Sequence, residues 1–190
     1  MIEAMSVRGT VRETAGIVGP LVIVMALAAA ALRGLDVLPR WVAGEGRGVV
    51  RYASVAGVEQ VFGERLLMPA FFPATLQWPP AAVRFHAGPP PAVAVTFAAR
   101  DGGAERLVLY ETRGARASIP MALMPAGLVL YRVVVPVAQG EAVLYRVQMS
   151  DGAIRNDLVW HRDDAAVALR YAGPADELVT IAKSLRRGRP

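Results

Sequence analysis

The feature that most constrains this chain is an uncharged apolar stretch near its N-terminus, TAGIVGPLVIVMALAAAAL at residues 14–32. Glu13 precedes the stretch and Arg33 follows it. A helix that crosses about 30 Å of hydrocarbon needs about 20 apolar residues, because each residue adds about 1.5 Å. The pattern therefore predicts a transmembrane anchor helix over residues 14–33. The spanning residues would include Pro20, Leu21, Val24, Leu27 and Ala31.

A cleaved secretory signal is the alternative interpretation of this stretch. Arg8 and Arg12 would form its basic region, and the four alanines at 28–31 offer a small-residue cleavage site. The apolar run is longer than the usual 7–15 residues of a signal peptide, which favours an uncleaved signal anchor. A buried helix of a soluble domain is disfavoured, since no face of the segment is polar.

The charges around the anchor leave its orientation open. Arg8 and Arg12 precede it, whereas four arginines follow it, at 33, 40, 47 and 51. Basic residues prefer the cytoplasmic side, so a bare count favours a cytoplasmic C-terminal domain. A family resemblance described below implies the opposite orientation, with the N-terminus in the cytoplasm.

Composition excludes several classes of function. Of 21 basic residues all but Lys183 are arginine, and the formal net charge is +5. No run of basic residues interleaves with aromatic residues along one element, so nucleic acid is not an expected partner. The chain has no cysteine, which excludes disulfides, thiol catalysis and thiolate zinc sites.

The rest of the chain divides into three parts by composition. Residues 1–13 form a short mixed-charge tail, predicted to be cytoplasmic. Residues 34–50 contain Pro39 and the run GEGRG, which is typical of a juxtamembrane linker. Within the linker, Trp41 lies close enough to the apolar stretch to contact lipid headgroups, or it belongs to the folded domain. Residues 51–190 are long enough for one domain with a core of its own.

The first part of this domain predicts a short helix and then an irregular segment. Ser54 is a suitable N-cap and Gly63 a suitable C-terminal glycine for a helix between them. Four prolines in residues 66–80 exclude a helix there. That segment carries Phe71, Phe72 and Trp78, which either contact a partner or pack on the domain's own sheet.

From residue 81 onward, alternating apolar residues and turn residues predict about seven antiparallel strands. A last helix is predicted after Gly173 and Pro174, with an apolar stripe that would cover the sheet. The residues beyond 185 are expected to be frayed. The expected fold class is therefore α+β, a curved antiparallel sheet covered by one or two helices. The predicted strands are 83–86, 93–97, 106–112, 129–137, 142–149, 154–161 and 166–172, and the stripe is Leu178, Ile181, Ala182 and Leu185.

Residues suited to catalysis or metal binding are sparse. His86 and His161 lack metal-ligand spacing, and the acidic pair at 163–164 is typical of a turn. None of the serines lies in a nucleophile elbow, and Glu111 has no partner that the sequence identifies. We therefore expect no catalytic, cofactor-binding or metal-binding residue, no cofactor, and a chain that is not an enzyme.

Four arginines suggest a basic surface. Arg84, Arg132, Arg146 and Arg170 are each predicted to lie on the strand face opposite the apolar residues. Such a face could contact anionic headgroups or an acidic protein surface. The alternative is an ordinary solvated face in an arginine-rich chain.

The order of these elements resembles a known group of bacterial proteins. The residues that carry the resemblance are VEQVFGER, LLMPAFFP, LVWHRDDAAVALRY and DELVTIAKSL, within about residues 51–186. They are similar to an uncharacterised anchored extracytoplasmic domain, related to lipoprotein-sorting and sigma-factor-regulatory (LolA/RseB-like) domains. The resemblance implies a curved antiparallel sheet on the periplasmic side of the inner membrane. It implies no catalytic residues.

Two functions remain open at this point. In the first, the chain is an accessory or structural subunit of a larger complex, bound to membrane lipids and to integral membrane proteins. Trp41, Phe71, Phe72, Trp78 and the four arginines are then the candidate contacts. In the second, the domain is a free-standing binding or regulatory module that holds a lipid, lipoprotein or peptide in the concave sheet. A filled concave face would favour the first function, and an open apolar one the second.

Overall fold

The structure is a computed structural model, and it describes residues 48–188 except 103, 115–117, 139 and 163–164. The predicted tail, the anchor over 14–33 and Trp41 lie outside the described residues. Within the part that the structure describes, neither helix has the length and apolar character needed to cross a membrane.

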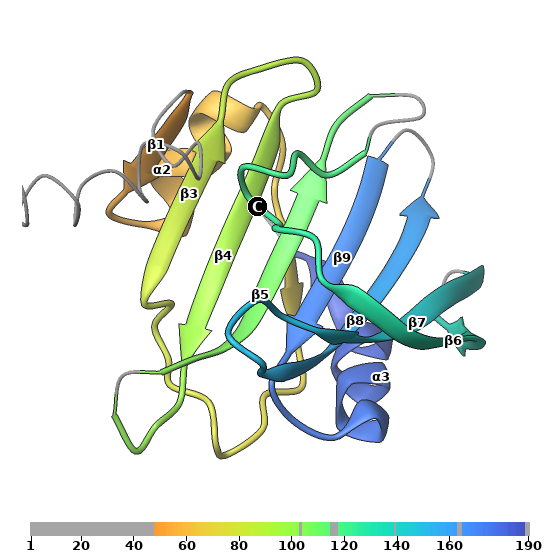
Figure 1. Ribbon diagram of the computed structural model, residues 1–190. Helices are drawn as coiled ribbons and strands as arrows, with labels where there is room; N and C mark the ends of the chain where they lie inside the picture. The colour runs from red at the N-terminus through yellow and green to blue at the C-terminus, as the bar shows by residue number, and fades with distance from the viewer. Residues whose placement is uncertain (1–47, 103, 115–117, 139, 163–164, 189–190) are drawn as a thin grey trace, which may run out of the picture. The chain divides into compact units, whose positions relative to one another are not determined.

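An eight-stranded antiparallel sheet forms the body of the domain (Figure 1). The expected antiparallel sheet is therefore confirmed, with β1 as a strand that the sequence analysis did not predict. Its strands follow the spatial order β1-β3-β4-β5-β9-β8-β7-β6. They are β1 (Val49–Tyr52), β3 (Ala82–His86), β4 (Ala92–Ala98), β5 (Glu105–Thr112), β6 (Leu128–Val137), β7 (Gly140–Gln148), β8 (Ile154–Arg162) and β9 (Ala165–Tyr171).

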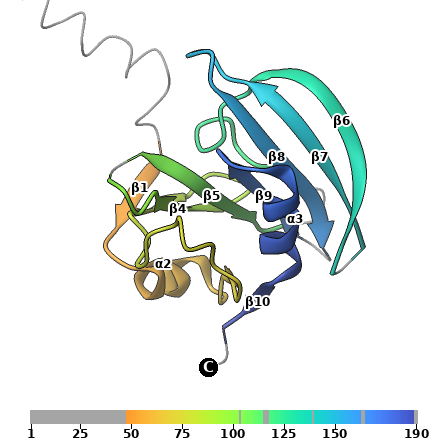
Figure 2. The same ribbon diagram turned by 90° about the horizontal axis from the view of Figure 1, so that it is seen from below.

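The position of β9 joins two parts of the sheet. Strands β1, β3, β4 and β5 are neighbours in space, and β6, β7 and β8 form a second set of neighbours. Strand β9 lies between β5 and β8 and pairs antiparallel with both. Strands β1 and β6 are consequently the two edges of the sheet, and Figure 2 shows how the sheet curves between them.

Two helices lie on the same face of the sheet (Figure 2). Helix α2 (Val55–Phe62) begins where predicted, because the Ser54 side chain accepts a hydrogen bond from the Gly57 N–H at 3.1 Å. It ends at Gly63, whose φ of 82° is a conformation that glycine adopts at low cost. Helix α3 (Ala175–Lys183) follows Pro174 and packs against β6, β8 and β9.

The main core lies between these helices and the sheet. Alternate residues of the central strands point to this face, including Phe97, Leu109 and Leu169. From α3, Leu178 and Ile181 are fully buried in the same cluster. The predicted covering role of the last helix is therefore confirmed, and it follows from the spacing of its apolar residues.

The opposite face of the central strands is also covered, which the sequence analysis did not predict. Residues 118–127, here called the covering loop, place Leu123 against Tyr110 and Ala168. All three side chains are buried. The middle of the sheet is therefore apolar on both faces, as is expected for strands that are covered on both sides.

A second, two-stranded sheet corrects the expectation of a frayed end for residues 186 and 187. Strand β10 (Leu185–Arg187) pairs antiparallel with β2 (Leu67–Pro69). The Ala70 N–H also donates to the Ser184 carbonyl at 3.1 Å, which extends this pairing. The end of the domain is thus held to the irregular segment that follows α2.

Candidate interaction surfaces

The described residues do not gather groups suited to metal binding. His161 is exposed at the end of β8, and His86 is half-buried on β3. Among the residues that the structure describes, no three His, Cys, Asp or Glu side chains could hold a metal ion together. The predicted turn at residues 163–164 lies outside the described residues.

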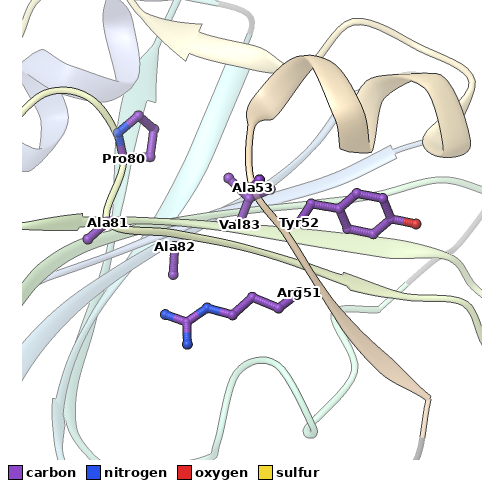
Figure 3. Close-up of a pocket in the computed structure, with 7 residues that line it drawn as sticks. All are labelled: Arg51, Tyr52, Ala53, Pro80, Ala81, Ala82 and Val83. Atoms are coloured by element: carbon purple, nitrogen blue, oxygen red, sulfur yellow. The ribbon is translucent and has the colours of Figure 1, made fainter.

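One surface pocket lies where β1 meets the start of β3 (Figure 3). It has a volume of about 370 Å³ and is lined mainly by small side chains. Figure 3 shows Arg51 and Tyr52 extending from β1 in different directions, so that they do not converge on one point. The lining contains no carboxylate, and its two polar side chains, Arg51 and Tyr52, do not face each other.

The concave face of the sheet is filled by the domain itself. Leu178, Ile181 and Leu185 are all buried, with exposures of 5% or less. They pack in one cluster with side chains of both helices and of the central strands. A lipid or peptide in this position would have to displace them, and each such side chain contributes about 1.5–3 kcal/mol by its burial.

The aromatic surface, defined here as Phe71, Phe72 and Trp78, combines packing and exposure. Phe72 is half-buried and meets the ring of Phe97 edge-on, with 4.9 Å between centroids. Trp78 stacks on the same ring at 6.2 Å, yet its side chain is 61% exposed. Phe71 is also exposed. The irregular segment thus packs part of its apolar surface and presents the rest to solvent.

The predicted common face holds for three of the four arginines and is wrong for Arg146. Cross-strand partners lie on the same face of a sheet, and the register places Arg84, Arg132 and Arg170 on the covering-loop face. Arg146 pairs with Asn156, which pairs with Tyr171, and so lies on the helix face. The large apolar residues on one face of β7 suggested that this face lies on the core and that Arg146 lies on the opposite face. In the structure both faces of this strand carry large side chains.

Arg170 is also buried rather than exposed, with 6% of its surface accessible. Its guanidinium donates two hydrogen bonds to Asp157, at 2.8 and 2.7 Å, and a third to the Pro125 carbonyl at 2.9 Å. Burial alone lowers the pKa of Arg170, but its hydrogen bonds to Asp157 raise that pKa overall. Arg170 therefore fixes the covering loop to the sheet and is not available to a partner.

The edge strand β6 is the most exposed apolar element among the described residues. Six of the twelve exposed large hydrophobic side chains lie on this one strand. Figure 2 shows β6 at the margin of the sheet, beyond β7. We call these six residues the apolar edge: Leu128, Val129, Leu130, Tyr131, Val133 and Val134.

The two edges of the sheet differ in length and character. Strand β1 has four residues, and its exposed Arg51 interrupts the apolar pattern. Strand β6 has ten residues, with Arg132 as its one charged side chain and Pro136 near its end. Natural sheets usually protect their edges with short strands, charges and prolines. The apolar edge is therefore weakly protected over most of its length, and its outer backbone groups are suited to pair with another strand.

Glu111 has two partners that the sequence did not identify. It accepts a hydrogen bond from the Leu67 N–H at 2.9 Å and forms an ion pair with Arg187 at 2.9 Å. Arg187 also contacts Glu64 at 3.0 Å. Burial raises the pKa of Glu111, and its contacts with Leu67 and Arg187 offset only part of this effect. This carboxylate connects β5 to both strands of the small sheet.

We expect Glu111→Gln to be better tolerated at neutral pH than at pH 4. The raised pKa means that the folded state favours the protonated form, so wild type loses stability as pH rises above the ordinary value of 4.5. Glutamine has no such loss and still accepts from the Leu67 N–H. Urea denaturation of both chains at pH 4 and pH 7 measures the difference. Glu111→Leu serves as the control, because it leaves the buried Leu67 N–H unpaired and costs about 1–3 kcal/mol.

Comparison with known proteins gives no family to which the chain can be assigned. No protein-family model, no curated protein and no solved structure matches it.

Proposed function

We propose that this chain is a single-pass membrane protein whose β-rich domain mediates protein–protein interaction. It acts as an accessory or structural subunit of a larger membrane complex and carries out no catalysis. The observation that carries the proposal is the apolar edge, six exposed side chains on a ten-residue strand whose outer backbone groups are open to pairing. Strands of this kind bind other strands through main-chain hydrogen bonds.

The aromatic surface adds a second contact region. Trp78 and Phe71 expose large rings on a segment held in place by packing and by hydrogen bonds. The Phe71 N–H, for example, donates to the Ser184 hydroxyl at 3.0 Å. Aromatic side chains on a fixed backbone are frequent anchors in protein interfaces.

The filled concave face supports this function over the ligand-holding alternative. A carrier of lipids or peptides needs an apolar cavity that buries most of its ligand. Here Leu178 and Ile181 of α3 occupy the corresponding space. We therefore place the interaction on the outside of the domain.

The membrane part of the proposal rests on the sequence. The uncharged residues 14–32 are suited to anchor the chain in the inner membrane. The domain would then lie on the periplasmic side, as the resemblance to anchored extracytoplasmic domains implies. An anchored subunit of this kind meets partners that are held in the same membrane.

The test is affinity capture of a C-terminally tagged chain from native membranes extracted with a mild detergent, followed by mass spectrometry. We expect the same integral membrane proteins to be recovered in a near-fixed ratio to the chain. Leu130→Ser combined with Val134→Ser should reduce this recovery about tenfold or more, because both side chains lie on the apolar edge.

The matched control is Val61→Ser, which changes a similarly exposed valine on α2. This variant should recover the partners as wild type does. Recovery of the chain alone, or with lipid only, would contradict the proposed function and would direct attention to ligand binding.

A further inference from the structure

We infer that the apolar edge takes up an extended segment of another protein, apolar in pattern and carrying carboxylate side chains. This inference rests on the proposed function and names the chemistry of the partner. It follows from the length of β6, from the placement of two arginines around it and from the poor fit of a second copy.

The length and exposure of β6 define the shape of its partner. Its exposed side chains point to both faces of the sheet, since Val129 and Val134 pair with Val147 and Val143, whereas Tyr131 and Val133 pair with Arg146 and Leu144. A strand added beside β6 would contact apolar side chains on both of its own faces. The partner segment is therefore extended, about as long as β6, and apolar at several positions on each face.

Two arginines supply the charge that this segment must match. Arg132 lies on β6 itself, and Arg146 is the cross-strand neighbour of Tyr131 on β7. Both side chains are exposed, and neither has an ion-pair partner among the described residues. They lie on opposite faces of the sheet, so a carboxylate on either face of the incoming segment meets a cation.

A second copy of β6 does not fit these requirements. If two copies pair antiparallel through this edge about a two-fold axis, the same face of both sheets points in the same direction. Residues that lie opposite each other across the pair must then belong to the same face of β6. When the two β6 strands overlap over nearly their full length, Arg132 of one copy lies directly or diagonally opposite Arg132 of the other copy. Like charges in these positions destabilise a strand pair, and residues 128–137 contain no carboxylate to offset them. Arg132 therefore disfavours self-pairing and favours an acidic partner.

Fluorescence anisotropy of three labelled peptides with the purified full chain tests the inference. The first is a ten-residue peptide of alternating valine and threonine with two central glutamates. In the second, lysines replace the glutamates, and in the third, prolines replace alternate residues. We expect the glutamate peptide to bind about tenfold more tightly than the lysine peptide. The proline peptide should not bind, since it lacks the donors of a strand.

Charge reversal on the protein identifies the surface. Arg132→Glu should reverse the preference between the glutamate and lysine peptides, without changing the thermal unfolding midpoint. Arg51→Glu, an exposed arginine on the opposite edge strand, is the matched control and should leave the preference unchanged. A photo-crosslinking residue at position 131 should form a covalent crosslink to the glutamate peptide, and one in place of Val61 on α2 should not.

Three results would overturn the inference. The first is equal affinity for the glutamate and lysine peptides, or no binding of either. The second is a concentration-dependent dimer in sedimentation, crosslinked through position 131, which assigns the edge to a second copy. The third is binding of anionic vesicles through position 131 without peptide binding. If membrane proteins are still captured through the apolar edge while the peptides fail, the proposed function stands and only the acidic partner is wrong.

Discussion

Asp157→Ala is expected to lower the free energy of unfolding by about 3–5 kcal/mol. The substitution removes both carboxylate acceptors of Arg170, whose side chain is buried between the sheet and the covering loop. Of the hydrogen bonds among the described residues, the guanidinium would then keep the one to the Pro125 carbonyl. An uncompensated buried charge of this kind is among the most destabilising changes in a protein. Urea denaturation followed by circular dichroism measures the effect.

Two controls separate the buried charge from the loss of an ion pair as such. Glu105→Ala removes an exposed pair with Arg84, at 3.9 Å, and should cost less than about 1 kcal/mol. Asp157→Leu combined with Arg170→Met removes both charges and should recover most of the stability lost in Asp157→Ala. A cost for Asp157→Ala as small as that for Glu105→Ala would show that water reaches Arg170.

Phe97→Ala is expected to cost about 3–5 kcal/mol. Phe97 is fully buried on the helix face of β4, and the rings of Phe72 and Trp78 pack against it. Its removal leaves a cavity beneath the aromatic surface, which those two rings can fill only by leaving their present positions. The same denaturation experiment measures this loss.

Trp78→Ala is the matched comparison for Phe97→Ala. It removes the outer ring of the same stack, and because most of that ring is exposed, we expect a cost of only about 1 kcal/mol. If Trp78 proves as important for stability as Phe97, its ring serves the fold and not a partner. A small cost, together with reduced capture of membrane proteins, would assign the exposed ring to the interface.

Local patterns were sufficient to predict most of the strands between residues 82 and 171. Alternation of apolar and polar residues with turns between them places β4, β5 and β8 close to their observed positions. The caps of α2 and the apolar stripe of α3 were equally clear. These features depend on residues close together in the sequence, so one sequence is enough to recognise them.

Features that depend on distant residues were not predicted. The strand order could not be derived, because several strands have similar apolar patterns. The burial of Arg170 was missed, although a hairpin of β8 and β9 centred near residues 163–164 places Asp157 opposite it. The exposure of β6 was also not predicted, because nine of its ten residues are uncharged and a strand of this composition is usually buried.

The central position of β9 has a consequence for how this domain is synthesised. The first four strands of the large sheet end at residue 112, but the strand that pairs with β5 is made only after residue 164. Until then, β5 and β8 each present an open backbone edge, and β8 lacks the cover that α3 later provides. The nascent domain therefore completes its sheet late, through contacts distant in sequence, which form slowly. During this interval the open strand edges expose the nascent chain to aggregation.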